Sequence, residues 1–136
     1  MNGLNESPLG ATFTASLEVT RELTVAHFVP HMPEVYGTPF MIILMETAAA
    51  QAVESYLKKG WVTVGTGINI SHLAATPLGL MVTATATVVS MDGNEIHFSV
   101  SAHDGVEAIG EGKHVRRPVE VSRFMKRANA KKERGG

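Results

Sequence analysis

One long apolar helix, in a chain that otherwise alternates like β-strands, is the feature that most limits the fold. The pattern predicts that this helix runs from Thr38 to about Lys59. Thr38 is a good N-cap, and Pro39 suits the first helical position because its missing N–H would have no partner there. Gly60 then ends the apolar run. A helix this apolar must pack against a sheet to bury its surface.

Several other stretches have the composition or the alternation of strands. We expect strands at residues 12–23, 61–75, 80–91, 95–103 and 106–115, and a short basic helix at 121–133. A loop at 24–37 is long enough to serve as a lid, and residues 1–11 look loose. Tight turns join the four later strands, which favours an antiparallel arrangement. The expected fold class is α+β, in a single domain of residues 1–136 with an antiparallel five-stranded sheet wrapped around one central helix.

Composition excludes several classes of protein. The 136 residues include no cysteine, so a disulfide scaffold, a thiolate metal site and a cysteine nucleophile are excluded. The first residues carry no basic region followed by an apolar one, and the most apolar run, 40–45, is interrupted by Glu46. We therefore expect neither a secretory signal nor a membrane span, and a cytoplasmic location. No metal-ligand spacing such as HExxH occurs, so we expect no metal.

The charge is distributed unevenly. Residues 1–112 carry a net charge of −8, whereas residues 113–136 carry +7. Such a basic C-terminal segment (residues 121–136 at its end) indicates contact with anions, either phosphates of a small ligand or nucleic acid. A solvated tail is the alternative. We expect a small ligand here and no nucleic-acid partner.

Glu46 is the most unusual residue of the predicted helix. At about 100° per residue, the polar side chains form one stripe that excludes Glu46. Its neighbours on the helix surface are Ile42, Ile43, Ala49, Ala50, Val53 and Leu57. An ionised carboxylate at the centre of an apolar face needs a partner, and such a group suits proton transfer. A structural glutamate satisfied by the fold is the alternative.

His72 is the candidate partner. Strand parity places it on one face with the Val and Ile side chains at 62, 64, 68 and 70, so it points toward the helix. An acid and an imidazole at one apolar interface indicate acid–base chemistry, and a satisfied core histidine is the alternative. Gly65 and Gly67 interrupt the same strand, which predicts either a bulge that frees backbone N–H groups or close packing on the helix. His114 carries only weak evidence for a role.

These residues resemble a known family. The segments 40–46, 65–77, 79–83 and 99–106 are similar to the fluoroacetyl-CoA-specific thioesterases, which are hot-dog-fold proteins, and the likeness extends from about Thr12 onward. The resemblance implies the hot-dog fold, a catalytic set of Thr38, Glu46 and His72, and an oxyanion-binding Gly65. It also implies a homodimer with the active site between subunits. The family carries a longer, phenylalanine-bearing lid where this chain has residues 30–37, so we expect general acyl-CoA hydrolysis rather than selectivity for fluoroacetyl-CoA.

We therefore expect an acyl-CoA thioesterase that converts a short or medium acyl-CoA to the free acid and CoA, with no cofactor beyond the CoA of the substrate. Glu46 would be nucleophile or general base, Thr38 nucleophile or hydrogen-bond partner, and His72 would orient and protonate. The expected contacts for CoA phosphates are Arg116, Arg117, Arg123, Lys126 and Arg127. The alternatives are a hot-dog hydratase or dehydratase acting on acyl thioesters, and a non-catalytic acyl-CoA-binding module.

Overall fold

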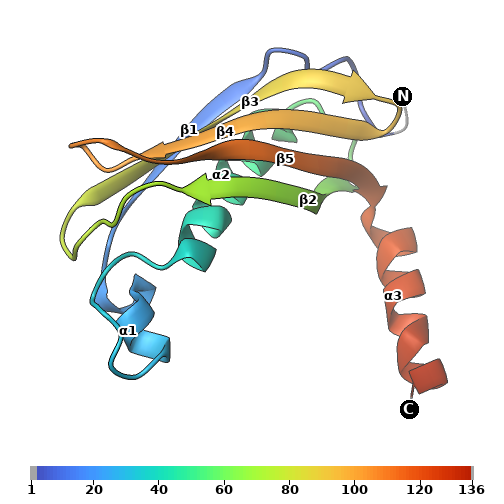
Figure 1. Cartoon of the computed structure of the whole chain (residues 1–136). Helices are drawn as coiled ribbons and strands as arrows, with labels where there is room; N and C mark the ends of the chain where they lie inside the picture. Colours follow the sequence, from blue (N-terminus) through green and yellow to red (C-terminus); the bar gives the residue numbers. More distant parts are fainter. Residues whose placement is uncertain (1–2, 136) are drawn as a thin grey trace.

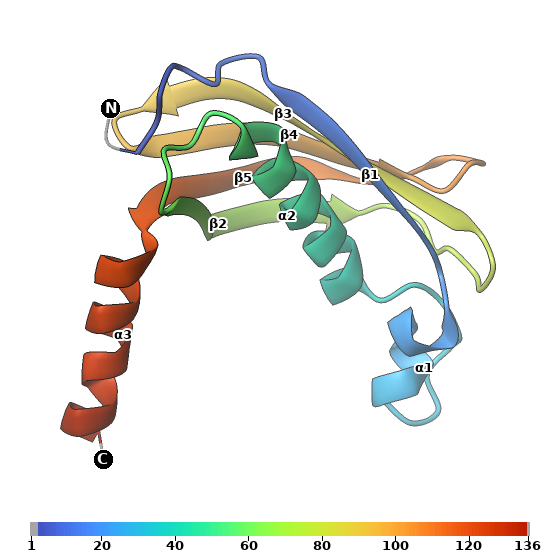
Figure 2. The same ribbon diagram turned by 180° about the vertical axis from the view of Figure 1, so that it is seen from behind.

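The computed structural model describes residues 3–135 and places one long helix in the hollow of a curved five-stranded sheet (Figures 1 and 2). The elements in chain order are β1 (Thr12–Glu18), the 3-10 turn η1 (Arg21–Leu23), α1 (Val25–Phe28), α2 (Thr38–Glu54), β2 (Trp61–His72), β3 (Met81–Asp92), β4 (Glu95–His103), β5 (Ala108–Glu120) and α3 (Val121–Gly135). This arrangement is the hot-dog fold, and the predicted α+β class is confirmed.

The order of the strands places β2 at a sheet edge. The sheet order is β1-β3-β4-β5-β2, and every pairing is antiparallel. A two-residue turn with Gly93 at φ +60° closes the hairpin from β3 to β4. β2 follows α2 in the chain and returns to pair only with β5, so its other edge has no strand partner among residues 3–135.

The core lies between α2 and the hollow face of the sheet. The buried residues of α2 are Met41, Leu44, Met45, Ala48, Ala49, Ala52 and Val53. The small alanines let the helix axis approach the sheet closely. On β4 the predicted alternation is confirmed, because Ile96, Phe98, Val100 and Ala102 are all buried. α1 and α3 lie outside this core, at opposite ends of the sheet (Figure 2).

Several predicted boundaries are wrong. β1 ends at Glu18, and the lid segment contains the short helix α1. The long helix stops at Glu54 instead of Lys59, and β2 stops at His72 instead of residue 75. β5 continues to Glu120, five residues beyond the prediction, and passes directly into α3.

The N-terminal segment has no regular structure but is attached to the body. Within the described part of residues 1–11, Leu4 is buried, and the Asn5 N–H donates to the Tyr56 carbonyl at 2.8 Å. The Lys58 N–H donates to the Gly3 carbonyl at 2.7 Å. The expectation of a loose segment is therefore wrong for residues 3–11, and residues 1–2 lie outside the described residues. No helix within residues 3–135 is long and apolar enough to cross a membrane.

Candidate active site

Thr38 and His72 form a hydrogen-bonded pair where α2 begins and β2 ends. Thr38 Oγ1 lies 2.7 Å from His72 Nδ1. The N-cap of α2 is Gly37, so the predicted capping role of Thr38 is wrong. The Thr38 hydroxyl is instead directed to the imidazole, and the pair joins the first residue of a helix to the last residue of a strand.

The surroundings of His72 favour the neutral imidazole. Burial lowers the pKa of His72 below its ordinary value, although a backbone hydrogen bond at Ala74 acts in the opposite direction. Because the ordinary value is about 6.5, the ring is neutral near pH 7. Its Nε2 is buried and has no hydrogen-bond partner among residues 3–135. A neutral ring whose Nδ1 faces a hydroxyl can accept the proton of that hydroxyl.

The Thr38–His72 pair opens onto a cavity of about 430 Å³. Most of the lining is small and apolar. The lining residues are Val25, Val35, Tyr36, Thr38, His72, Leu73, Ala74 and Ala75. Such a mixture of apolar walls and a few convergent polar groups is typical of small-molecule sites. We call this the threonine cavity.

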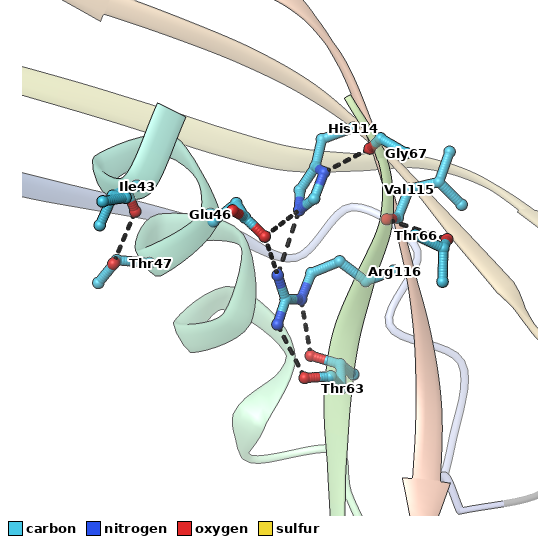
Figure 3. A network of polar contacts seen from close by, with 9 residues as sticks. All are labelled: Ile43, Glu46, Thr47, Thr63, Thr66, Gly67, His114, Val115 and Arg116. Atoms are coloured by element: carbon cyan, nitrogen blue, oxygen red, sulfur yellow. Dashed lines mark hydrogen bonds and ion pairs between the residues drawn. The ribbon is translucent and has the colours of Figure 1, made fainter. Parts of the chain in front are cut away.

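Glu46 lies elsewhere, against Gly65 on β2, and its carboxylate points toward His114 and Arg116 (Figure 3). Its Oε2 is 3.4 Å from Nη1 of Arg116 and 4.0 Å from Nε2 of His114. A Cβ at residue 65 would overlap Oε2, so only glycine lets the carboxylate lie here. Glu46 lines a second cavity of about 380 Å³, which we call the glutamate cavity. Its lining residues are Glu46, Gly65, Thr66, Gly67, Ile68 and His114.

The predicted position of Glu46 at the centre of the apolar helix face is wrong. In the chain, 39% of its side chain is exposed, and its neighbour Ile43 is 54% exposed. The buried face is centred on the side of Met45 and Ala49, so Glu46 lies on its flank. The carboxylate therefore remains accessible to a ligand.

His114 and Arg116, on the inner face of β5, hold the carboxylate in place. Both are buried. Arg116 donates from Nε to the Thr63 hydroxyl and from Nη2 to the Thr63 carbonyl, each at 2.8 Å. The carbonyl of Gly67 lies 2.7 Å from His114 Nδ1 and can only accept, so Nδ1 carries the ring proton. His114 Nε2 then accepts from Arg116 Nη1 at 3.2 Å.

The electrostatics of this network agree with a neutral His114 that carries its proton on Nδ1. Burial is the largest influence on the pKa of His114 and lowers it, and the Arg116 charge lowers it further. Burial also lowers the pKa of Arg116, which the Glu46 charge opposes. A buried guanidinium keeps its charge only beside hydrogen-bond acceptors and an anion, and Thr63 and Glu46 supply these. His114 was missed by the sequence analysis, although strand parity places it with Arg116 and opposite the exposed Lys113.

A β-bulge in β2 brings the network together. The β2–β5 register shifts between Gly65 and Gly67, which confirms the predicted bulge, and Gly65 also packs closely on Glu46 of α2, which was the other alternative. The extra residue, Thr66, reverses the alternation, so Thr63 faces inward before the bulge and Ile68 lines the glutamate cavity after it. The predicted common face is therefore wrong for Val62 and Val64, whereas Ile68, Ile70 and His72 share the inner face as predicted.

The structure thus gathers the predicted site residues into two half-sites rather than one. Thr38 pairs with His72, and Glu46 pairs with Gly65. Thr38 and Glu46 are eight residues apart on α2, about 12 Å along the helix axis. The two cavities share no lining residue.

The arginines expected to contact CoA phosphates also lie in different surroundings. Arg116 is committed to the buried network, so we assign it a structural role there instead of a phosphate contact. Arg117 is half exposed and lies 3.7 Å from Glu95, and Arg123 is exposed on α3.

Comparisons with known proteins agree with this fold and this site. The fluoroacetyl-CoA thioesterase of Streptantibioticus cattleyicolor is 40% identical over 133 residues, covering 93% of this chain and 96% of that protein. The solved fluoroacetyl-CoA thioesterase superposes with a TM-score of 0.87 at 39% identity, covering 93% of this chain and 98% of that one. A variant of that enzyme, solved with fluoroacetate and CoA, gives 0.77 at 42% identity, with 85% and 98% coverage.

A more distant structure shares the fold as well. A thioesterase superfamily member from Thermus thermophilus has a TM-score of 0.89 at 25% identity, with 96% of this chain and 97% of that chain covered. The sequence model described as fluoroacetyl-CoA-specific thioesterase matches residues 19–122, which contain both half-sites. The chain is therefore a member of the fluoroacetyl-CoA-specific thioesterase family.

Proposed function

We propose that this protein is an acyl-CoA thioesterase that hydrolyses short acyl-CoA esters to the free acid and CoA. The observation that carries the proposal is the 2.7 Å contact between Thr38 Oγ1 and His72 Nδ1 at the mouth of the threonine cavity. A cavity of about 430 Å³ with alanine and valine walls accommodates a small acyl group. A cytoplasmic location stays a prediction from the sequence.

The chemistry divides between the half-sites. We propose that neutral His72 accepts the Thr38 proton, and that Thr38 Oγ1 attacks the thioester carbonyl. The N–H of Gly65, at the bulge, stabilises the oxyanion, and protonated His72 returns its proton to the leaving thiolate. Glu46 then acts as general base for the water that hydrolyses the acyl-threonine ester, and the proton that it takes from this water returns to Thr38 Oγ1 as the ester bond breaks. The Glu46 carboxylate suits this role because it is accessible and because its contact with Arg116 Nη1 is long, at 3.4 Å.

A homodimer would unite the half-sites. β2 is an edge strand whose outer edge has no partner within the described residues 3–135, and the apolar side chains of Ile43 and Ile68 beside Glu46 are 54% and 40% exposed. Edge strands and exposed apolar patches of this kind mark association surfaces. Antiparallel pairing of two β2 strands about a two-fold axis keeps both α2 helices on one face of a continuous sheet.

The bulge restricts the register of such a pairing. Residues opposite each other must face the same side of the sheet. We propose the register with Asn69 at the two-fold axis, because the extra residue at the bulge then brings Gly65 of the partner subunit opposite His72. Each active site would then take Thr38 and His72 from one protomer and Gly65 and Glu46 from the other.

Loss of either half-site should abolish turnover. We expect Thr38→Ala and Glu46→Gln each to lower kcat for acetyl-CoA at least about 100-fold, because each removes a group that acts in the chemical step. Thr38→Ser, which keeps the hydroxyl, should retain most activity. Glu54→Gln, at an exposed position of the same helix, is the matched control and should change kcat less than about two-fold. Thiol release across an acyl-chain series provides the measurement.

Two results would contradict the proposed function. Water addition to crotonyl-CoA without thiol release would identify a hydratase. Binding of acyl-CoA esters without turnover of any of them would identify a binding module.

The rate should depend on pH through His72. Since burial lowers the pKa of this ring, its neutral, proton-accepting form persists as the pH falls to about 6.5 and is lost below that value. We therefore expect kcat/KM to be flat from neutral pH down to about 6.5 and to decline below it. Absorbance of the thioester bond follows the reaction without depending on thiol ionisation. An acid limb with a midpoint above about 6.5 would contradict a neutral, half-buried His72.

The dimer can be tested with a single cysteine, because the chain contains none. Asn69→Cys should form an intermolecular disulfide under mild oxidation, since residues facing each other across a two-fold axis have Cα atoms about 4.5–5.5 Å apart. Thr14→Cys, on the opposite edge strand β1, is the control and should remain uncross-linked on a non-reducing gel. Equal cross-linking of the two variants, or a monomer in sedimentation, would contradict the proposed pairing.

A further inference from the structure

We propose that a groove at the base of α3 binds the phosphoadenosine end of CoA, and that it serves the active site of the partner subunit. The proposal rests on the acyl-CoA thioesterase function and on the dimer described above, and it adds a binding site that neither requires. The groove is separate from both half-sites.

Residues from the start of β2 and from the junction of β5 with α3 line the groove, and these parts of the chain lie side by side in Figure 1. It has a volume of about 400 Å³. Its lining residues are Trp61, Asn94, Pro118, Val119, Glu120, Arg123, Phe124 and Arg127. The Val121 N–H donates to the Gly60 carbonyl at 3.0 Å, which fixes the start of α3 against the start of β2.

The lining combines the two side-chain types that bind a nucleotide. Trp61 and Phe124 offer aromatic faces on which a base can stack. Arg123 and Arg127 lie one turn apart on α3, so both guanidinium groups reach the same side of the helix. Guanidinium groups match phosphate oxygens in charge and geometry. A phosphorylated adenine nucleotide, with a ring to stack and several phosphates, fits this combination.

The charge of the whole chain supports an anionic ligand at this place. The last 24 residues carry a net charge of +7, and the side chains of α3 are exposed and strongly basic toward its C-terminus. The rest of the chain carries −8, which repels a polyanion. This asymmetry directs CoA phosphates to α3 and away from the acidic body.

Geometry assigns the groove to the other subunit. Within one chain, Trp61 and His72 stand at opposite ends of β2, eleven residues and about 36 Å apart. The pantetheine arm is only about as long as four extended residues, about 14 Å. In the proposed register, Gly65 of the partner subunit lies opposite His72, and Trp61 of the partner subunit precedes that glycine by four residues, about 13 Å along the strand. The arm therefore reaches the groove of the partner and not its own.

Binding can be measured without turnover, because Trp61 is the only tryptophan of the chain. Titration with adenosine 3′,5′-bisphosphate should produce a saturable change in tryptophan emission. In Arg123→Gln/Arg127→Gln the Kd should rise about ten-fold or more, since charge-assisted hydrogen bonds are lost. Lys131→Gln/Lys132→Gln, which removes the same charge from α3 outside the groove, should raise it less than about three-fold.

Two outcomes of this titration would overturn the groove. One is the absence of a saturable signal. The other is an equal loss of affinity in the two double variants, which would indicate attraction by net charge alone. Because the readout is binding, neither outcome depends on whether the protein hydrolyses thioesters.

A mixed dimer tests which subunit the groove serves. When Thr38→Ala protein is co-assembled with Arg123→Gln/Arg127→Gln protein, the intact Thr38 of the heterodimer lies in the chain that lacks the groove arginines. If the groove acts on the partner, that site retains the wild-type KM for acetyl-CoA. If the groove serves the active site of its own chain, every active site in the mixture shows the elevated KM of the Arg123→Gln/Arg127→Gln variant. That result would make the proposal fail. A wild-type dimer without thiol release would instead defeat the proposed function, leaving the fluorescence result to stand alone.

Discussion

The missing side chain at Gly65 is the constraint on which the rest of the site depends. Any Cβ there would overlap the Glu46 carboxylate, and without that carboxylate the buried Arg116 would lose its anion. Thr63 and His114 complete the hydrogen bonds of the guanidinium, and the bulge at Thr66 turns both Thr63 and Ile68 inward. A helix, an edge strand and its neighbour are thus connected through one carboxylate. Since a buried ion that loses its partner is strongly destabilising, these residues depend on one another.

Much of the fold was predictable because the local patterns are strong. The alternation of β4, the tight turn at Gly93 and the single apolar helix specify an antiparallel sheet over α2, and the family resemblance supplied the hot-dog fold. The end of the helix was harder to predict, since residues 54–59 contain neither glycine nor proline and the first glycine after the helix is Gly60. The extension of β5 through Pro118 was also missed, because proline removes one donor but is tolerated in this strand, where it pairs with Thr63.

The site was predicted only in part, for specific physical reasons. His72 was identified by strand parity, although the bulge invalidates that parity for Val62 and Val64. Glu46 was singled out by a helix phase that put it at the centre of the apolar face, whereas the face that packs on the sheet is turned toward Met45. Arg116 looked like a surface cation, because its burial depends on Glu46 and Thr63, which are distant in sequence. Periodicity describes one helix or strand at a time. It therefore does not predict contacts such as those of Arg116, which join several elements.

The central claim is that one protomer supplies Thr38 and His72 while the other supplies Glu46 and Gly65. Co-assembly of Thr38→Ala protein with Glu46→Gln protein tests it most directly. In a two-fold dimer, random pairing makes half of the molecules heterodimers with one intact site each, so the account predicts recovery of about a quarter of wild-type thiol release. A mixture no more active than the two inactive parents would contradict it.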